Sequence, residues 1–253
     1  MLTLRVRLGI DPKKKRSSFV VNQLEKGFMR LSKPRLTERL SRRIPPHYRA
    51  DLAGILISES VIQKRIAALG RAITRDFAGQ EVIVISLLSG TVLFLADLLR
   101  QLPFPLRVDF MGVSSYRSGT ESGQLVYTKE IKLDLRKSHI LLVDDILDTG
   151  KTLRTVFAKL RTLGPQSIRT CVLLDKQSRR TEPFDADYVG FILPNLFVVG
   201  YGLDYAERYR NLPFLGVLKP EIYEVTHSLL NPDKSAKKSG SAPKTSSRAN
   251  LDI

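Results

Sequence analysis

The chain has 253 residues, enough for one sizeable hydrophobic core, and it carries a formal charge of +16. The charge lies mainly at the ends: residues 1–50 carry 14 basic and 3 acidic side chains, residues 231–253 carry 5 and 2, and residues 51–230 carry 22 and 20. A nearly neutral central region argues against a core built as a nucleic-acid-binding surface, which would be strongly basic.

No segment approaches the roughly eighteen apolar residues needed to cross a bilayer, so we expect no membrane span. The N-terminus lacks a charged stretch followed by an apolar run and a small-residue cleavage site, which argues against secretion. Cys171 is the single cysteine, so no internal disulfide can form. Reduced thiols are typical of the cytoplasm, and we therefore expect a cytoplasmic protein.

Composition divides the chain into three parts. Residues 1–50 mix basic residues with proline and show no sustained period, so we expect a basic N-terminal extension that is flexible or partly helical near residues 20–31. Residues 231–253 are rich in Ser, Lys, Ala and Pro and should form a disordered basic tail. Residues 51–230 remain as one folded domain.

Apolar runs alternate with helical patterns through this domain. Strands are expected at residues 53–57, 82–87, 106–114, 139–143 and 168–174, where apolar and β-branched residues are continuous. Helices are expected at residues 59–77, 91–102 and 150–163; the first places apolar side chains at 62, 66, 69, 73 and 77 on one face. This alternation predicts an α/β fold with a mostly parallel sheet and covering helices.

The most informative segment runs from Leu141 to Leu153 and reads Leu-Leu-Val-Asp-Asp-Ile-Leu-Asp-Thr-Gly-Lys-Thr-Leu. An apolar strand leads into paired carboxylates, a third carboxylate, and a Thr-Gly-Lys-Thr turn that opens a helix. Carboxylates at the carboxyl end of a strand can accept hydrogen bonds from sugar hydroxyls or hold a hydrated divalent cation. The amides and hydroxyls of the turn suit a phosphate. The segment therefore predicts a site for a phosphorylated, metal-carrying sugar.

Two other interpretations of this segment explain less. A surface turn between a strand and a helix also favours Asp, Thr and Gly, but it does not account for three carboxylates in five positions. A Walker P-loop would need a glycine ahead of the Gly-Lys-Thr, and this chain lacks it.

The segment resembles the phosphoribosyl-pyrophosphate-binding motif of the type I phosphoribosyltransferases. Asp148 is similar to the acid that hypoxanthine-guanine enzymes carry there, whereas adenine and orotate enzymes and the pyrimidine-operon attenuators usually carry another residue. Four further segments agree with the hypoxanthine-guanine branch in the family's order: Leu-Leu-Ser-Gly at 87–90, Val-Ser-Ser-Tyr at 113–116, Leu-Asp-Lys at 174–176, and residues 197–204 followed by Arg210. The resemblance covers about residues 51–223.

This resemblance implies an α/β fold with an open, mostly parallel twisted sheet, helices on both faces and a small hood region. It implies a purine-salvage transferase that moves a phosphoribosyl group from phosphoribosyl pyrophosphate to hypoxanthine or guanine, giving IMP or GMP and pyrophosphate. Mg²⁺ is the implied cofactor. The family is usually dimeric or tetrameric, so a homo-oligomer is expected.

The resemblance also implies roles for the sugar and phosphate residues. Asp144 and Asp145 should hold the ribose hydroxyls, directly or through Mg²⁺, and Asp204 should be a metal-binding acid near the leaving pyrophosphate. Asp148 is the implied catalytic residue, placed to take a proton at N7 of the purine. Phosphoribosyl pyrophosphate or nucleotide binding is implied for Asp144, Asp145, Asp148, Thr149, Gly150, Lys151, Thr152, Leu88, Ser89, Gly90 and Arg210.

For the base, Lys176 resembles the lysine that donates to the 6-oxo group, Phe197 the stacking aromatic, and Val198 the residue whose backbone contacts the other edge. Each of these residues has a simpler interpretation when it is considered alone. Phe197 would be a core aromatic, Lys176 a solvated lysine, and Asp204 with Arg210 a surface charge pair. Because they occur together and in the family's order, we favour their assignment to the substrate site. Ser115 and Tyr116 stand at the base of an expected lid over residues 114–127.

The first loop departs from the family, because bacterial relatives typically have lysine where this chain has Ser89. A backbone role for the loop, which in the family often contains a non-proline cis peptide, tolerates serine. Leu88 and Ser89 are therefore kept as expected site residues, without the lysine side chain's contribution.

Two further functions stay open. A phosphoribosyltransferase-fold protein can be an RNA-binding regulator, and the basic ends would attract RNA, although attenuator-type relatives generally lack an acid at Asp148. Alternatively, the N-terminal arm tethers an enzyme to nucleic acid or an anionic surface. In that case the arm should be dispensable for catalysis, since the recognisable site residues all follow residue 51.

Overall fold

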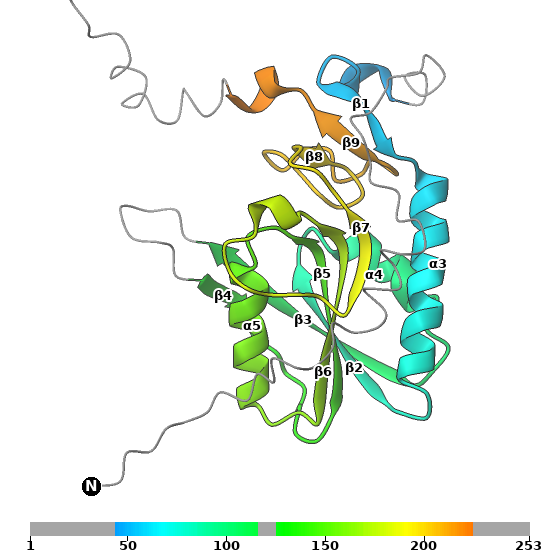
Figure 1. Ribbon diagram of the computed structural model, residues 1–253, viewed down its shortest axis with the longest axis vertical. Helices are drawn as coiled ribbons and strands as arrows, with labels where there is room; N and C mark the ends of the chain where they lie inside the picture. The colour runs from blue at the N-terminus through cyan, green and yellow to red at the C-terminus, as the bar shows by residue number, and fades with distance from the viewer. Residues whose placement is uncertain (1–43, 116–124, 225–253) are drawn as a thin grey trace, which may run out of the picture.

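A six-stranded sheet with strand order β4-β3-β2-β5-β6-β7 forms the centre of the protein (Figure 1). The computed structural model describes residues 44–115 and 125–224. The strands are β1 Leu52–Ile57, β2 Val82–Leu88, β3 Leu106–Ser115, β4 Leu125–Lys129, β5 His139–Leu147, β6 Ser167–Asp175, β7 Tyr188–Ile192, β8 Val198–Val199 and β9 Leu215–Leu218. The helices are α3 Glu59–Asp76, α4 Val92–Leu99 and α5 Lys151–Thr162, with 3-10 turns η1 Pro46–Tyr48 and η2 Gln177–Arg179.

The sheet is mostly parallel, as the sequence predicts. Strands β3, β2, β5, β6 and β7 pair in parallel, and only the edge strand β4 runs antiparallel, against β3. Strand β5 is longer than expected: the apolar run ends at Val143, yet pairing with β6 continues through Asp144↔Val172 to Leu147↔Asp175. The paired carboxylates therefore lie within the strand and not in a loop after it.

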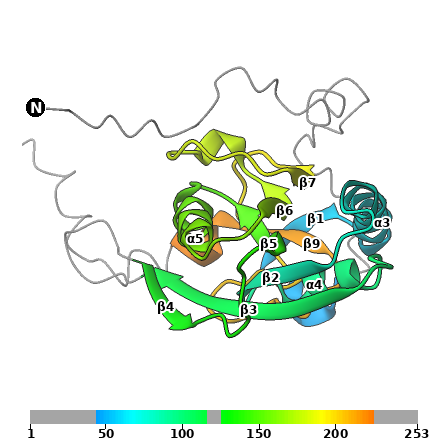
Figure 2. The ribbon, with the colours of Figure 1, turned by 90° about the horizontal axis from the view of Figure 1, so that it is seen from below.

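Helices cover both faces of the sheet, because consecutive strand residues point to opposite sides. On β2, Val82 and Val84 pack in the same cluster as the buried faces of α3 and α4, while Ile83 and Ile85 pack with α5. Figure 2 shows α5 on one side of the sheet and α3 with α4 on the other. The expected open sheet with helices on both faces is thus confirmed.

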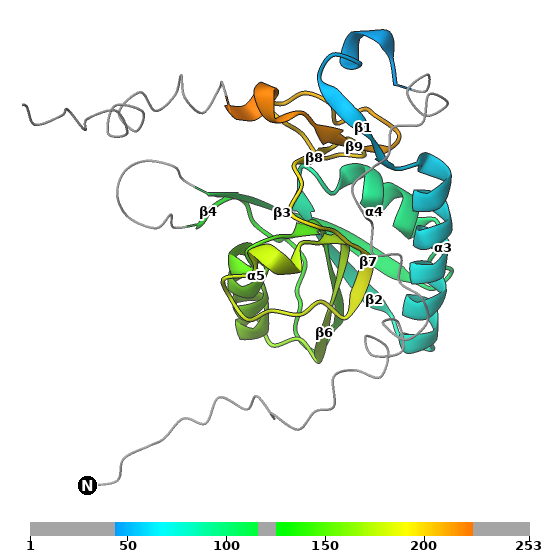
Figure 3. The same ribbon diagram turned by 45° about the horizontal axis from the view of Figure 1, so that its top comes forward.

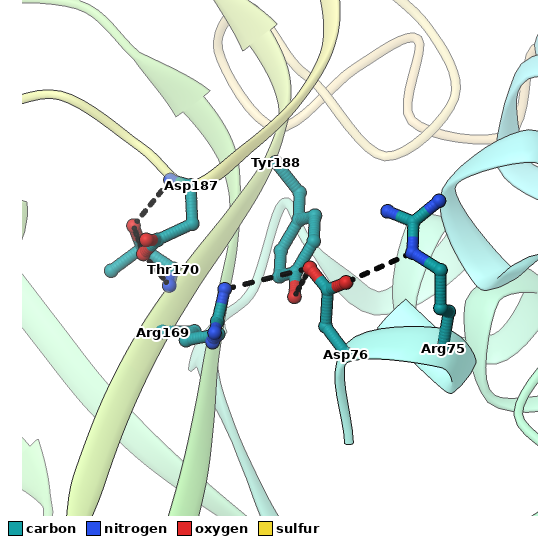
Figure 4. A network of polar contacts seen from close by, with 6 residues as sticks. All are labelled: Arg75, Asp76, Arg169, Thr170, Asp187 and Tyr188. Atoms are coloured by element: carbon teal, nitrogen blue, oxygen red, sulfur yellow. Dashed lines mark hydrogen bonds and ion pairs between the residues drawn. The ribbon is translucent and has the colours of Figure 1, made fainter. Parts of the chain in front are cut away.

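Helix α3 carries the predicted apolar face. Ile62, Ile66, Leu69 and Ile73 are each at most 1% exposed, and its first helical residue follows Ser58 as expected. At its C-terminal end, Asp76 accepts a hydrogen bond from the Tyr188 hydroxyl at 2.9 Å and pairs with Arg169, which ties the helix to β6 and β7 (Figure 4). These contacts lie at the amino-terminal ends of the parallel strands, where they hold α3 against the sheet. The functional residues are expected at the other, carboxyl ends of the strands.

A second, three-stranded sheet, β1-β9-β8, forms the hood together with the segments around it (Figure 3). Its core contains Leu52, Val199, Leu212 and Phe214, and it also contains Ile44, which is 2% exposed. Residues 44–50 therefore pack as part of the hood, ahead of the boundary expected at residue 51. Residues 1–43, 116–124 and 225–253 lie outside the described residues, and with them most of the expected extension and lid and all of the expected tail at 231–253.

Within residues 44–115 and 125–224, the helices are all too short or too polar to span a membrane.

Candidate active site

The carboxyl ends of β2, β5 and β6 meet beneath the hood, and the paired acids Asp144 and Asp145 lie there at the end of β5. Asp144 is 8% exposed, and its Oδ1 accepts hydrogen bonds from the Asp145 amide at 3.0 Å and the Thr91 hydroxyl at 3.4 Å. Burial, followed by the neighbouring Asp145 charge, raises the pKa of Asp144 well above its ordinary value. Burial also raises the pKa of Asp145, against the opposing charge of Arg210. A cation or a set of hydroxyl donors would relieve this repulsion.

The loop after β2 packs directly on this acidic pair. The Leu88–Ser89 peptide bond is a non-proline cis peptide, of the kind that the resemblance leads us to expect in the first loop. Gly90 is so close to Asp145 that a Cβ on this glycine would lie 1.8 Å from the Asp145 Oδ2. Leu88 and Ser89 are both exposed. The expected first loop is therefore brought to the acids by the structure.

The hood reaches the same point through Gly202. A Cβ on Gly202 would lie 2.0 Å from the Gly90 carbonyl oxygen, and the φ of Gly202 is +97°. Arg210 donates from Nη1 to the Gly202 carbonyl at 2.9 Å and forms an ion pair with Asp204 at 3.0 Å. Asp204 and Arg210 therefore form an ion pair in the structure, and the pair lies next to the first loop.

The turn between β5 and α5 has the shape of an anion cradle. Gly150 is the N-cap of α5 with a φ of +88°, a left-handed conformation that glycine adopts without steric cost. The Thr149 hydroxyl accepts a hydrogen bond from the Lys151 amide at 3.4 Å. Lys151 is exposed and Thr152 is partly buried, and both lie in the first turn of the helix. The five expected residues 148–152 therefore surround one helix N-terminus.

Asp148 and Lys176 come together at the ends of neighbouring strands. Lys176 is only 7% exposed, which excludes a solvated lysine, and its amide donates to the Leu147 carbonyl at 3.0 Å. Burial lowers the pKa of Lys176, and the charge of nearby Asp148 opposes that shift. Arg179 also pairs with Asp148, with 3.1 Å between its Nε and the Asp148 Oδ1. The ends of β5 and β6 thus bring a carboxylate and a buried ammonium into the same part of the site.

The base-stacking candidates lie on the hood side of the site. Val198 is buried in β8, while the Phe197 ring stacks on Tyr223 at 4.9 Å between centroids and meets Tyr205 edge-on at 5.4 Å. Phe197 is therefore packed partly as a core aromatic. Ser115 is the last residue of β3, paired in register with Leu125, whereas Tyr116 lies outside the described residues.

Several residues at the site carry no signal in the sequence. Thr91 hydrogen-bonds to Asp144, Arg179 pairs with Asp148, and Arg180 donates from Nη1 to the Asp148 carbonyl at 2.9 Å. None belongs to a spaced motif, and only the pairing of strands far apart in the chain brings them together. Among the described residues, no group of three or more His, Cys, Asp and Glu side chains is placed to hold a metal ion by itself.

Comparison with known proteins identifies the family that shares this geometry. The sequence model of a family described as the phosphoribosyl transferase domain matches residues 58–206. The chain belongs to the phosphoribosyltransferase family. A crystal structure of a hypoxanthine phosphoribosyltransferase from Staphylococcus aureus is similar to this phosphoribosyltransferase with a TM-score of 0.68 and 39% identity, covering 71% of this chain and 98% of that chain.

Two kinds of protein are found among the curated relatives of this phosphoribosyltransferase. A Staphylococcus aureus protein named hypoxanthine-guanine phosphoribosyltransferase is 41% identical over 174 residues, which are 68% of this chain and 97% of that protein. The bifunctional protein TilS/HprT of Listeria innocua is 44% identical over 174 residues, again 68% of this chain. This chain spans only 27% of the length of that bifunctional protein.

Proposed function

We propose that the protein is a purine-salvage enzyme that transfers the phosphoribosyl group of phosphoribosyl pyrophosphate to hypoxanthine or guanine, releasing pyrophosphate and giving IMP or GMP. One observation carries the proposal: Lys176 is buried at the end of β6, and its amide donates at 3.0 Å to the carbonyl of Leu147, the residue before Asp148, which follows the end of β5. A carboxylate that accepts a proton beside an ammonium that only donates fits a purine with an N–H and an oxo group.

The phosphoribosyl pyrophosphate would lie between the turn and the two loops. Its 5′-phosphate fits the amides and hydroxyls of residues 148–152, and its ribose hydroxyls fit the acidic pair. The pyrophosphate then faces the first loop at Gly90 and the Arg210 guanidinium, which the Gly202 contact holds together. This arrangement holds the leaving group on the face of C1′ opposite the incoming base.

Mg²⁺ fits the donor set. Asp144 and Asp145 are adjacent carboxylates whose pKa values are both raised by burial, and a divalent cation would stabilise their charged forms. Asp144 and Asp145 would hold the ion together with ribose oxygens, and Asp204 would be a metal-binding acid near the leaving pyrophosphate. Mg²⁺ suits this arrangement because it prefers oxygen ligands and keeps few protein ones. When bound, Mg²⁺ would neutralise the charge that develops on the leaving pyrophosphate.

The base would be read by three side chains and one backbone segment. Lys176 would donate to the 6-oxo oxygen, and an adenine amino group would oppose that ammonium with hydrogens of its own. Asp148 would take the proton that leaves the purine as the glycosidic bond forms. For that, the Arg179 guanidinium must release the carboxylate that it pairs with here at 3.1 Å. Phe197 would stack on the base, and the Val198 backbone would contact its other edge.

Steady-state turnover with Mg²⁺, phosphoribosyl pyrophosphate and separate bases tests this proposal. Turnover is expected with hypoxanthine and guanine and not with adenine or uracil. Turnover with adenine at a comparable rate would overturn the reading of Lys176 and Asp148. Binding of phosphoribosyl pyrophosphate without turnover on any base would favour the RNA-binding regulator instead, which RNA titration of the same protein would then test.

We also assign the protein to the cytoplasm and to a homo-oligomeric state as part of the proposal. Cys171 is a free, fully buried thiol, which fits a reducing compartment. Sedimentation analysis of the purified chain tests the oligomer, and a monomer at micromolar concentration would contradict it.

A further inference from the structure

The phosphate-binding turn is held from outside by a second segment. This segment, residues 176–182 after β6, is called the strap here. The strap packs on the turn at Gly150, where a Cβ would lie 2.8 Å from the Glu182 carbonyl oxygen and 3.1 Å from the Arg180 Cδ. Because the two segments are in direct contact, the strap can fix the conformation of the turn.

Three successive carbonyls of the turn all accept hydrogen bonds from the strap. The Leu147 carbonyl accepts from the Lys176 amide at 3.0 Å. The Thr149 carbonyl accepts from the Thr181 and Glu182 amides, each at 3.0 Å. The carbonyl between them, that of Asp148, accepts instead from a side chain, the Arg180 Nη1 at 2.9 Å. The Arg180 side chain therefore bonds the one carbonyl of the three that receives no hydrogen bond from a backbone amide of the strap.

The direction of these carbonyls fixes the direction of the phosphate-binding amides. The peptide bonds concerned are trans, and in a trans peptide the carbonyl and the following N–H point in opposite directions. Carbonyls of residues 147–149 that face the strap therefore turn the amides of residues 148–150 away from it. Within the described part of the chain, these three amides donate to no protein acceptor, so they are free for a ligand.

Arg180 is itself held in place by a buried acid. Its Nη2 forms an ion pair with Asp175, whose other oxygen accepts from the Gln177 side chain at 3.3 Å. The side chains of Arg180 and Asp175 are 16% and 8% exposed, so water competes little for either. Burial raises the pKa of Asp175, and the Arg180 charge opposes that shift. An arginine is suited to this place because its planar fork reaches a carboxylate and a carbonyl at once.

We propose that Arg180, anchored by Asp175, is a positioning residue that aims the Thr149 amide at the 5′-phosphate of the substrate by holding the Asp148–Thr149 peptide in one orientation. Arg180 does not touch the phosphate and acts only through the turn. The inference rests on the proposed function, since it takes residues 148–152 as the place where the 5′-phosphate binds.

The test compares IMP with inosine, which lacks the 5′-phosphate. Calorimetric dissociation constants for both ligands are measured on wild type and Arg180→Met. IMP binding should weaken by about ten- to a hundredfold, the factor that one misaligned hydrogen bond to a charged group is worth. Inosine binding should change less than threefold. In turnover, KM for phosphoribosyl pyrophosphate should rise while KM for hypoxanthine holds.

Three further variants keep the test decisive. Arg180→Met leaves Asp175 buried and unpaired, so the double variant Arg180→Met with Asp175→Asn gives the same comparison without a lone buried charge. Arg180→Lys, which reaches one acceptor at a time, should fall between wild type and Arg180→Met. Arg154→Met is the matched control: it removes the ion pair between Arg154 and Glu182 of the strap without touching a turn carbonyl, and should leave the IMP-to-inosine ratio unchanged.

Each outcome has one meaning. An IMP-to-inosine ratio in the double variant equal to that of wild type would overturn the role of Arg180, as would equal weakening of both ligands. A wild-type protein that binds IMP no better than inosine would instead overturn the proposed function itself.

Discussion

Adding one methyl group at Gly202 should separate the hood from the first loop. A Cβ on Gly202 would lie 2.0 Å from the Gly90 carbonyl oxygen, whereas carbon and oxygen atoms in close contact normally stand about 3.3 Å apart. Relieving the overlap needs a shift of about 1.3 Å. The contact is backbone against backbone, so no side-chain rotation can absorb the shift. The first loop, the hood turn that contains Gly202, or both must move.

The expected cost has two parts. Misplacing groups around a reacting centre by about 1 Å lowers rates on the order of a hundredfold, so kcat/KM for Gly202→Ala should fall by about that factor. The φ of +97° at Gly202 is also unfavourable for alanine, which should lower the free energy of unfolding by about 1–3 kcal/mol. Steady-state turnover and chemical unfolding measure the two parts separately.

Gly79→Ala is the matched control. Gly79 also has a positive φ, +74°, but a Cβ there would meet no atom within 4 Å. That variant should lose about 1 kcal/mol of stability and keep its turnover. A folded Gly202→Ala protein with kcat/KM within threefold of wild type would refute the view that this contact sets the geometry of the site.

Three other predictions follow from single features. Asp148→Asn should lower kcat by orders of magnitude and leave KM for phosphoribosyl pyrophosphate nearly unchanged, because the amide keeps the size but loses the basicity; near-normal kcat would remove Asp148 from proton transfer. Burial opposes ionisation of Asp109, yet hydrogen bonds from Lys129 and three amides hold its pKa at about 2 against an ordinary 3.8. The ionised Asp109 should contribute roughly 2 kcal/mol to the free energy of unfolding above about pH 4, and this contribution should be lost as the pH falls towards 2. Unfolding measured at a series of pH values should therefore show a weaker dependence of that free energy on pH in Asp109→Asn than in wild type. Deleting residues 1–43 should leave turnover and melting temperature unchanged. Deleting residues 1–50 should lower the free energy of unfolding by about 2 kcal/mol or more, because it removes the buried Ile44. Equal melting temperatures for the two truncated proteins would contradict this prediction.

The frame of the protein could be predicted because its signals are local. The five strands and three helices expected between residues 53 and 174 are present in the structure, since each has its own period or continuous apolar run. The sequence predicts β1 but not the other two hood strands, because β8 and β9 have two and four residues, too few for a period to show. It also does not predict β4 and β7, two edge strands of the main sheet with five residues each. Ile44 was assigned to the extension because a single apolar residue among basic ones predicts nothing by itself.

The candidate site likewise contains features that local sequence predicts and features that depend on segments far apart in the chain. The acids Asp144, Asp145 and Asp148 could be named because the signal lies within five consecutive positions. That the first two lie inside strand β5 could not be predicted, because pairing with β6 extends the strand against the low strand propensity of aspartate. Arg180 and the Gly202–Gly90 contact depend on segments 32 and 112 residues away in the chain, which only the folded structure brings together.

The buried state of Cys171 has a practical consequence for measuring motion. It is the only cysteine in the chain, it is 0% exposed, and burial raises the pKa of its thiol far above the ordinary value. Alkylating reagents react with exposed thiolates, so the folded protein should stay unlabelled without any prior substitution. A cysteine introduced at the exposed Val126, within the expected lid, would then be the single site for a fluorophore. The sequence is already a labelling background in which one dye can test whether the expected lid moves as substrate is added.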